Sequence, residues 1–348
     1  MMGNDNMNEA LEVRRKNLVI IDGNNMCWRG FKRAPLTSKG KNVDLVYMSL
    51  RMVFNYFSLV GDNGDLIIVW DGGRDKRRLE RFPEYKRKPR PYTEQENADF
   101  EEYKRQQGIF KELIREIGIS QILCKGREAD DVINTIVKTR KVYSPILRSN
   151  IGEIDNPVLI KNFKVYDGYI YIVSNDLDYS QLLEYDNVAW YNPNTSSAMF
   201  KVDVYNTYGF YPSEYPVYKA IVGKHDNIPG VNGVGPTITQ KYLEAVRNGN
   251  EIDVEKSGKV MKKLISALSL GELSTMIEIS GFLDVPVDEI ADGVIIPKVV
   301  GNNVIEYGRH VKSLLAQFEF DSIIDKLQDS ILAIYQSVSN DNKFGLEV

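Results

Sequence analysis

Four short stretches of the chain are dense in aliphatic and aromatic residues and lack the alternation of a half-exposed strand. They are residues 17–22, 65–71, 119–124 and 168–176. Strands buried on both faces of a parallel sheet have this continuous hydrophobic pattern. Helical periodicity separates them, most plainly at residues 42–60 and 94–118. The pattern predicts an α/β domain with a doubly wound, mostly parallel sheet over residues 17–204.

The pattern changes after residue 204, where helical periodicity dominates. The predicted helices cover residues 236–248, 254–268, 272–279 and 307–337. We therefore expect residues 205–348 to form an α-rich C-terminal domain. Residues 1–16 are polar and predict a flexible N-terminus, while residues 141–167 fit no period and predict an inserted loop or hairpin.

Composition narrows the functional classes. Of the 348 residues, 43% are hydrophobic and 26% are charged, as in ordinary soluble proteins. The sequence contains no apolar run of membrane-spanning length and no signal-peptide core, so we expect a cytoplasmic protein without a membrane partner. The two cysteines are far apart and there are only two histidines, which argues against zinc sites and histidine-based catalytic triads.

The net charge of −4 argues weakly against a nucleic-acid partner, but its distribution argues for one. Residues 74–90 contain nine lysines and arginines against three acids. Such a patch attracts polyanions, and Phe82, Tyr85 and Tyr92 lie near enough in sequence to stack on bases. The alternative is a solvated basic loop.

Acidic residues follow the predicted strands. Asp22, Asp71, Asp176 and Asp178 lie at the carboxyl ends of strands, where α/β sheets bind ligands. A helical stripe begins at Ala129, so its first turn adds further acids to the same rim. These are Glu128, Asp130 and Asp131. Each acid alone is explained by a turn, a helix cap or the helix dipole.

Together, the seven carboxylates predict bound cations. Two like charges ~4 Å apart repel by roughly 4 kcal/mol at an effective dielectric of 20. Ligands that are all oxygen suit Mg²⁺ or Mn²⁺. An acidic metal site beside a basic segment indicates phosphodiester hydrolysis, with two ions activating water and stabilising the leaving oxygen.

Six pieces of sequence, in this order, resemble the 5′ nuclease superfamily. They are "IDGNN", "VWDGGRDKRR", "FPEYKRKPRP", "GREADDVI", "VSNDLDYSQLL" and "HDNIPGVNGVGP". The superfamily comprises flap endonucleases, the 5′→3′ exonuclease domains of bacterial DNA polymerases and stand-alone phage enzymes. The resemblance implies a PIN-like core with a helical arch, here at about residues 74–105.

The resemblance also implies roles for individual residues. Asp22, Asp71, Glu128 and Asp130 would hold one metal ion. Asp176 and Asp178 would hold a second, with Asp131 nearby as a shared or outer acid. Lys86 and Arg90 would contact the scissile phosphate, although Arg90 is one residue further along than the family spacing and Lys88 is the alternative. The expected DNA-binding residues of this segment are Arg77, Arg78, Arg81, Tyr85, Arg87 and Lys88.

The glycine-rich stretch after residue 227 resembles the family's helix–turn–helix element, which grips duplex DNA and holds a monovalent cation such as K⁺. Its glycines Gly230, Gly233 and Gly235 would let backbone amides approach phosphate, and Pro236 suits the first turn of a helix. The alternative is a glycine-rich turn between domains.

One departure from the family concerns Asp226, which would be a ligand of the second metal ion. The family has another aspartate three residues earlier, whereas this chain has Gly223 followed by Lys224. Either the acid is absent or the loop is one residue shorter. The expected consequence is a weakened second site with activity retained.

The resemblance implies a stand-alone, monomeric, metal-dependent 5′ nuclease. Its expected substrates are 5′ ends, flaps and RNA primers in replication or repair. The arrangement is compatible with a phage protein acting in the bacterial cytoplasm, and the sequence identifies no replication partner. Two alternatives are a structure-specific DNA-binding protein with impaired catalysis and a ribonuclease of the PIN type.

Overall fold

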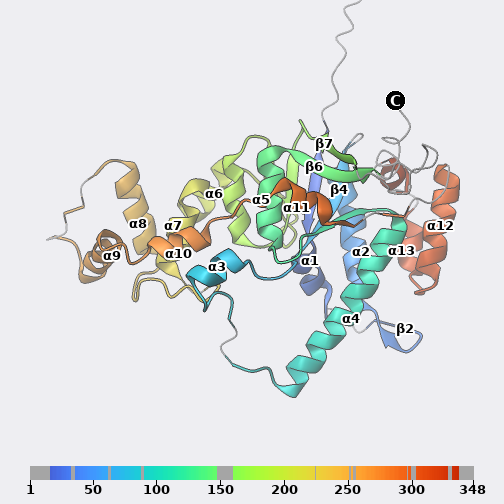
Figure 1. Ribbon diagram of the computed structural model, residues 1–348, viewed down its shortest axis with the longest axis horizontal. Helices are drawn as coiled ribbons and strands as arrows, with labels where there is room; N and C mark the ends of the chain where they lie inside the picture. The colour runs from blue at the N-terminus through green and yellow to red at the C-terminus, as the bar shows by residue number, and fades with distance from the viewer. Residues whose placement is uncertain are drawn as a thin grey trace, which may run out of the picture.

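The computed structural model describes most of the chain. The described residues are 16–32, 36–61, 64–87, 90–146, 160–223, 225–250, 252–253, 256–295, 297–298, 303–327 and 331–336. They form an elongated molecule with a central sheet (Figure 1). Residues 1–15 of the expected flexible N-terminus, Lys88 and Lys224 therefore lie outside the described residues.

The sheet has seven strands in the order β10-β9-β8-β1-β4-β5-β11. The strands are β1 (Leu18–Asp22), β4 (Asp65–Trp70), β5 (Ser120–Leu123), β8 (Ile170–Val173), β9 (Val188–Asn192), β10 (Ser197–Met199) and β11 (Val294–Ile295). Strands β9, β8, β1, β4 and β5 run parallel, whereas β10 and β11 pair antiparallel at the two edges. The predicted mostly parallel sheet is confirmed, and all four predicted strands belong to it.

Helices cover both faces of the sheet because each strand buries alternate side chains on opposite sides. Val19 and Ile21 pack with α2 (Asp44–Tyr56) and α4 (Glu94–Ile117). Ile20 and neighbouring side chains pack with α5 (Ala129–Thr139) on the other face. The shorter elements within the first 81 residues of the chain are α1 (Gly23–Gly30), β2 (Thr37–Ser38), β3 (Lys41–Asn42), η1 (Phe57–Leu59) and α3 (Lys76–Arg81).

The segment predicted as a loop or hairpin contains an antiparallel pair of strands, β6 (Lys141–Ile146) and β7 (Ile160–Val165). Lys164 Nζ lies 3.2 Å from Asp65 Oδ2, and the Tyr166 hydroxyl donates to the same oxygen at 2.6 Å. These contacts attach the base of the hairpin to the start of β4. Its tip, residues 147–159, lies outside the described residues.

The helices of the predicted C-terminal domain divide between the two ends of the molecule (Figure 1). After η2 (Leu177–Glu184), the remaining elements are α6 (Lys201–Tyr208), η3 (Pro212–Glu214), α7 (Tyr215–Val222), α8 (Pro236–Arg247), α9 (Lys259–Ser269), α10 (Ser274–Ser280), α11 (Val287–Asp292), α12 (Val304–Ala316) and α13 (Asp321–Leu327). Helices α8 and α9 share a small core at one end. Tyr307, Val311 and Leu315 of α12 instead belong to the hydrophobic core of α2 and α4. Among the described helices, none is long and apolar enough to span a membrane.

Candidate active site

The carboxyl ends of the central strands bring acidic side chains to one rim. Asp22 ends β1 and caps α1, accepting a hydrogen bond from Asn25 N at 3.0 Å. Asp71 follows β4 and accepts from Asn24 Nδ2 at 2.7 Å and from Ala129 N at 2.8 Å. Asp71 thereby joins the end of β4 to the first turn of α5, so the two predicted groups of acids meet.

Burial and mutual repulsion disfavour the charged forms of the half-buried acids. Burial raises the pKa of Asp22 to about 7, and repulsion from Asp71 and then Asp176 adds to the effect. Burial likewise raises the pKa of Asp130 well above its usual value, although the nearby Lys86 ammonium opposes the shift. A buried carboxylate with this shift favours a neutralising proton or cation.

The acids differ in whether the protein itself neutralises them. Glu128 Oε2 accepts from Lys86 Nζ at 2.5 Å, and Arg78 pairs with Asp131. Lys219 Nζ lies 2.5 Å from carboxylate oxygens of both Asp178 and Asp226. Of the eight acids predicted as metal ligands, four have no lysine or arginine at ion-pairing distance among the described residues, namely Asp22, Asp71, Asp130 and Asp176. We call these the unpaired acids and the other four the paired acids.

The unpaired acids fit a hard divalent cation by donor type, because all their ligand atoms are carboxylate oxygens. Asp71 and Asp176 are exposed, while Asp22 and Asp130 are half-buried, so solvent reaches the group. As the described side chains stand, no three Asp, Glu, His or Cys residues already surround a single ion position.

The turn that carries Lys86 is attached to the loop at Asp226. Lys86 N donates to Asp226 O at 3.1 Å, and Asn227 Nδ2 donates to the carbonyls of Glu84 and Arg87 at 2.7 and 2.5 Å. Lys86, Asp226 and Asn227 all have φ between +50° and +64°. Sequence reasoning missed Asn227, although an Asn beside the expected ligand is a residue type that tolerates this left-handed conformation.

The predicted DNA-binding arginines have different environments. Arg78 is 2% exposed and Tyr85 is 3% exposed, so neither lies on a surface that DNA reaches. Arg78 must neutralise Asp131, and the Tyr85 hydroxyl donates to Glu128 Oε2 at 3.1 Å. The structure corrects the predicted DNA contact for these two residues, because both side chains are committed to buried acids.

The other basic residues of the segment are partly or fully exposed. Arg77 contacts Asp75, Arg81 pairs with Glu278, and Arg87 pairs with Glu84. Arg90 pairs with Glu96 through two nitrogens, each 2.8 Å from a carboxylate oxygen, at the start of α4. The pairs of Arg81, Arg87 and Arg90 are on the surface, where DNA phosphates can exchange with them, whereas the Asp75 partner of Arg77 is fully buried.

The glycines at the end of α7 explain the missing acid. Gly223 has φ +68°, and a Cβ there would lie 2.6 Å from Gly230 N, so no aspartate fits at this position. Lys219, one turn earlier on α7, instead contacts Asp226, and the sequence analysis missed this residue. Gly233 and Gly235 have open space where a Cβ would stand, as a close approach of phosphate requires.

Comparisons with known proteins give a consistent result. Residues 17–148 match the family described as 5′-3′ exonuclease, N-terminal resolvase-like domain. The chain is 32% identical over 234 residues to a 5′-3′ exonuclease of Aquifex aeolicus, a match that covers 65% of this chain and 70% of that protein. It is 28% identical over 322 residues to DNA polymerase I of Caldicellulosiruptor bescii, covering 89% of this chain but 33% of the polymerase.

A solved structure shows the same fold. The bacteriophage T5 flap endonuclease, in a complex with DNA and metal ions, aligns over 91% of this chain and 98% of its own length. The TM-score is 0.53 and the sequence identity is 22%. At this level of sequence identity, the similarity shows a shared fold only.

Proposed function

Because the chain belongs to the 5′-3′ exonuclease family, we propose that it is a 5′ nuclease that hydrolyses DNA phosphodiesters near 5′ ends and flaps with the help of divalent metal ions. The group of unpaired acids at the strand ends, next to the turn of Lys86, is the observation that carries this proposal. The relatives do not favour the alternative of a DNA-binding protein with impaired catalysis.

We propose Mg²⁺ or Mn²⁺ as the metal, held chiefly by Asp22, Asp71, Asp130 and Asp176. Such ions, when bound, lower the pKa of water and stabilise charge on the leaving oxygen. Glu128 and Asp178 lie beside this group and would supply further carboxylate oxygens to two such ions, in exchange for their contacts with Lys86 and Lys219. We retain K⁺ at the glycine-rich loop as part of the same proposal.

The protein's own residues position the DNA. Lys86, on a turn held by the Asp226 loop, presents an ammonium next to the acids and would neutralise the scissile phosphate. The open glycines Gly233 and Gly235 precede α8, where backbone N–H groups bind a duplex phosphate. In this proposal, the loop at residues 225–230 connects the helix–turn–helix grip to the reactive rim.

Cleavage of a 5′-labelled flap and of a 5′-ended duplex, with and without Mg²⁺, tests the proposal. Asp71→Asn should abolish turnover while leaving flap binding intact, because the amide keeps the side-chain shape and one acceptor oxygen but loses the charge. Asp186→Asn, an exposed acid next to β9, is the matched control and should cleave normally. Absence of Mg²⁺-dependent cleavage by the unmodified chain would contradict the function, and normal turnover by Asp71→Asn would contradict the metal assignment.

A further inference from the structure

The ion pair between Arg78 and Asp131 is buried beneath the acidic rim. Asp131 is fully buried in the first turn of α5, and Arg78 is 2% exposed on α3. Arg78 Nη1 lies 2.5 Å from Asp131 Oδ2, and Nη2 lies 2.8 Å from Oδ1. A two-pronged contact of this kind fixes the plane and the position of a carboxylate, as a single ammonium contact cannot.

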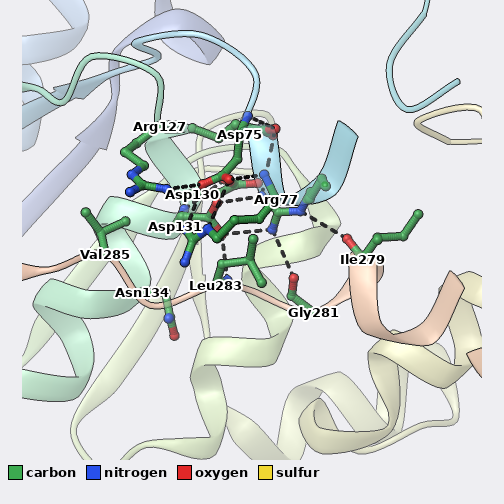
Figure 2. Close-up of polar contacts among 12 residues, drawn as sticks. Asp75, Arg77, Arg127, Asp130, Asp131, Asn134, Ile279, Gly281, Leu283 and Val285 are labelled. Carbon is green, nitrogen blue, oxygen red and sulfur yellow. Dashed lines mark hydrogen bonds and ion pairs between the residues drawn. The ribbon is translucent and has the colours of Figure 1, made fainter. Parts of the chain in front are cut away.

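Backbone groups at the end of α10 and in the segment that follows it complete the hydrogen bonding of the pair. Arg78 donates through Nε to Ile279 O at 3.2 Å and through Nη2 to Gly281 O at 2.9 Å. Leu283 N donates to Asp131 Oδ1 at 2.7 Å. In Figure 2, dashed lines reach Ile279 and Gly281 on one side of the cluster and Leu283 beside Asp131. The pair therefore joins α3, α5 and residues 279–283.

The pair borders two acids that would hold a metal ion. Arg78 Nη1 lies 3.8 Å from Glu128 Oε1, and Asp131 N donates to Asp130 Oδ1 at 2.8 Å. Successive helical residues point about 100° apart, so Asp131 can face α3 while Asp130 faces the rim. The position of the whole first turn of α5 thus depends on a pair that lies behind it.

We propose that Arg78 and Asp131 are a positioning pair, which fixes Glu128 and Asp130 for a divalent cation and links the base of the arch to that site. Asp131 itself does not bind the ion, since both of its oxygens already accept hydrogen bonds from Arg78 or Leu283. Arg78 is buried in the same pair and does not contact DNA. The inference rests on the proposed function for the nature of the reaction, but metal binding alone tests it.

The test compares Arg78→Lys, Asp131→Asn and the double variant. Mn²⁺ is titrated into each metal-free, DNA-free protein, and electron paramagnetic resonance measures the free and bound ion. In a separate assay, kcat and KM are measured on a 5′ flap. Each single variant should lose roughly 10- to 100-fold in Mn²⁺ affinity, as is typical when the partners of a metal ligand are removed. The double variant should lose no more than the worse single variant, and KM should stay unchanged.

Two results would overturn the proposal. Losses of Mn²⁺ affinity that multiply in the double variant, with Asp131→Asn much the more severe, would make Asp131 a direct ligand. A raised KM with unchanged kcat and a shallower salt dependence of DNA binding in Arg78→Lys would make Arg78 a phosphate contact.

A control and a second measurement separate positioning from folding. Asp65→Asn breaks another buried pair, with Lys164, at the opposite end of β4. It should lower the melting temperature and leave Mn²⁺ affinity unchanged. Anomalous diffraction from Mn²⁺ in crystals of the unmodified chain needs no substitution, and a manganese peak coordinated by Asp131 would refute the proposal. If the unmodified chain binds Mn²⁺ but cleaves no flap, the proposed function is contradicted. The Mn²⁺ affinities of the variants still show whether Arg78 and Asp131 position the metal ligands.

Discussion

The paired and unpaired acids lie on the same rim but differ in what the fold has supplied to them. Glu128, Asp131 and the pair Asp178 and Asp226 each contact a lysine or arginine of the chain. The unpaired acids have hydrogen bonds from neutral groups instead, such as those from Asn24 and Asn25. An acid that already has a buried cationic partner is held in place, whereas an acid without one favours an external cation. The comparison therefore separates acids whose charge the protein already neutralises from acids that depend on an external cation.

Among the substitutions that test this comparison, removal of the Lys86 ammonium should give the largest change in kcat. Lys86→Ala leaves Glu128 without its ammonium and removes the positive charge next to the scissile phosphate. We expect kcat to fall by roughly 100-fold, as for other groups that stabilise charge in the transition state, while duplex affinity changes little. Single-turnover cleavage and DNA binding in Ca²⁺ measure the two quantities, and an equal loss of both would make Lys86 a simple phosphate anchor.

Lys219→Met converts a paired group into an unpaired one. The ammonium between Asp178 and Asp226 competes with a divalent cation, so its removal should raise Mn²⁺ affinity at this pair by about tenfold, which is 1.4 kcal/mol. The cost is a less stable metal-free protein, because two half-buried carboxylates then repel. Calorimetric titration measures the change. Lys201→Met, which breaks an exposed pair with Glu184, should alter neither quantity.

Asn227→Ala tests how far Lys86 depends on the neighbouring loop. The substitution removes two hydrogen bonds to the turn at Glu84–Arg87, each worth about 1 kcal/mol. We expect a several-fold loss of kcat with unchanged metal affinity. Asn227→Asp keeps the side-chain shape but replaces the donor with an acceptor, and it should be no better than the alanine variant. Full activity of both would show that the turn is held by other contacts.

The smallest expected effect is a change with pH in the melting temperature of the metal-free protein. The pKa of Asp22 is raised to about 7 by burial and then by Asp71, from 3.8 in the unfolded chain. Between these values the folded state keeps a proton that the unfolded state has lost, so the free energy of unfolding falls as pH rises through that window. The metal-free protein should thus melt a few degrees lower at pH 8 than at pH 5, measured relative to Asp22→Asn. Mg²⁺ should remove this difference, and an identical pH dependence of both proteins would contradict the assignment.

Sequence reasoning was most successful where local pattern and position along the chain are sufficient. The continuous apolar runs predicted four strands of the sheet, and the acids after them follow from the rule for strand ends. It failed where a side chain's partner is distant in sequence. Arg78 reads as one more cation in a basic segment, yet it is buried against Asp131, 53 residues away. The single long helix expected at residues 307–337 is divided into α12 and α13, whose apolar faces pack on the first domain.

The sequence by itself determined the parallel sheet, the order of the acidic and basic pieces and the resemblance to 5′ nucleases, because these depend on periodicity and spacing along the chain. Only the tertiary structure decided which acids are neutralised by the protein and which remain for a cation. That division depends on where Arg78, Lys86 and Lys219 end up after folding. Charged groups form ion pairs only when they lie within a few ångströms of each other. Folding brings these groups together from positions that are dozens of residues apart in the sequence.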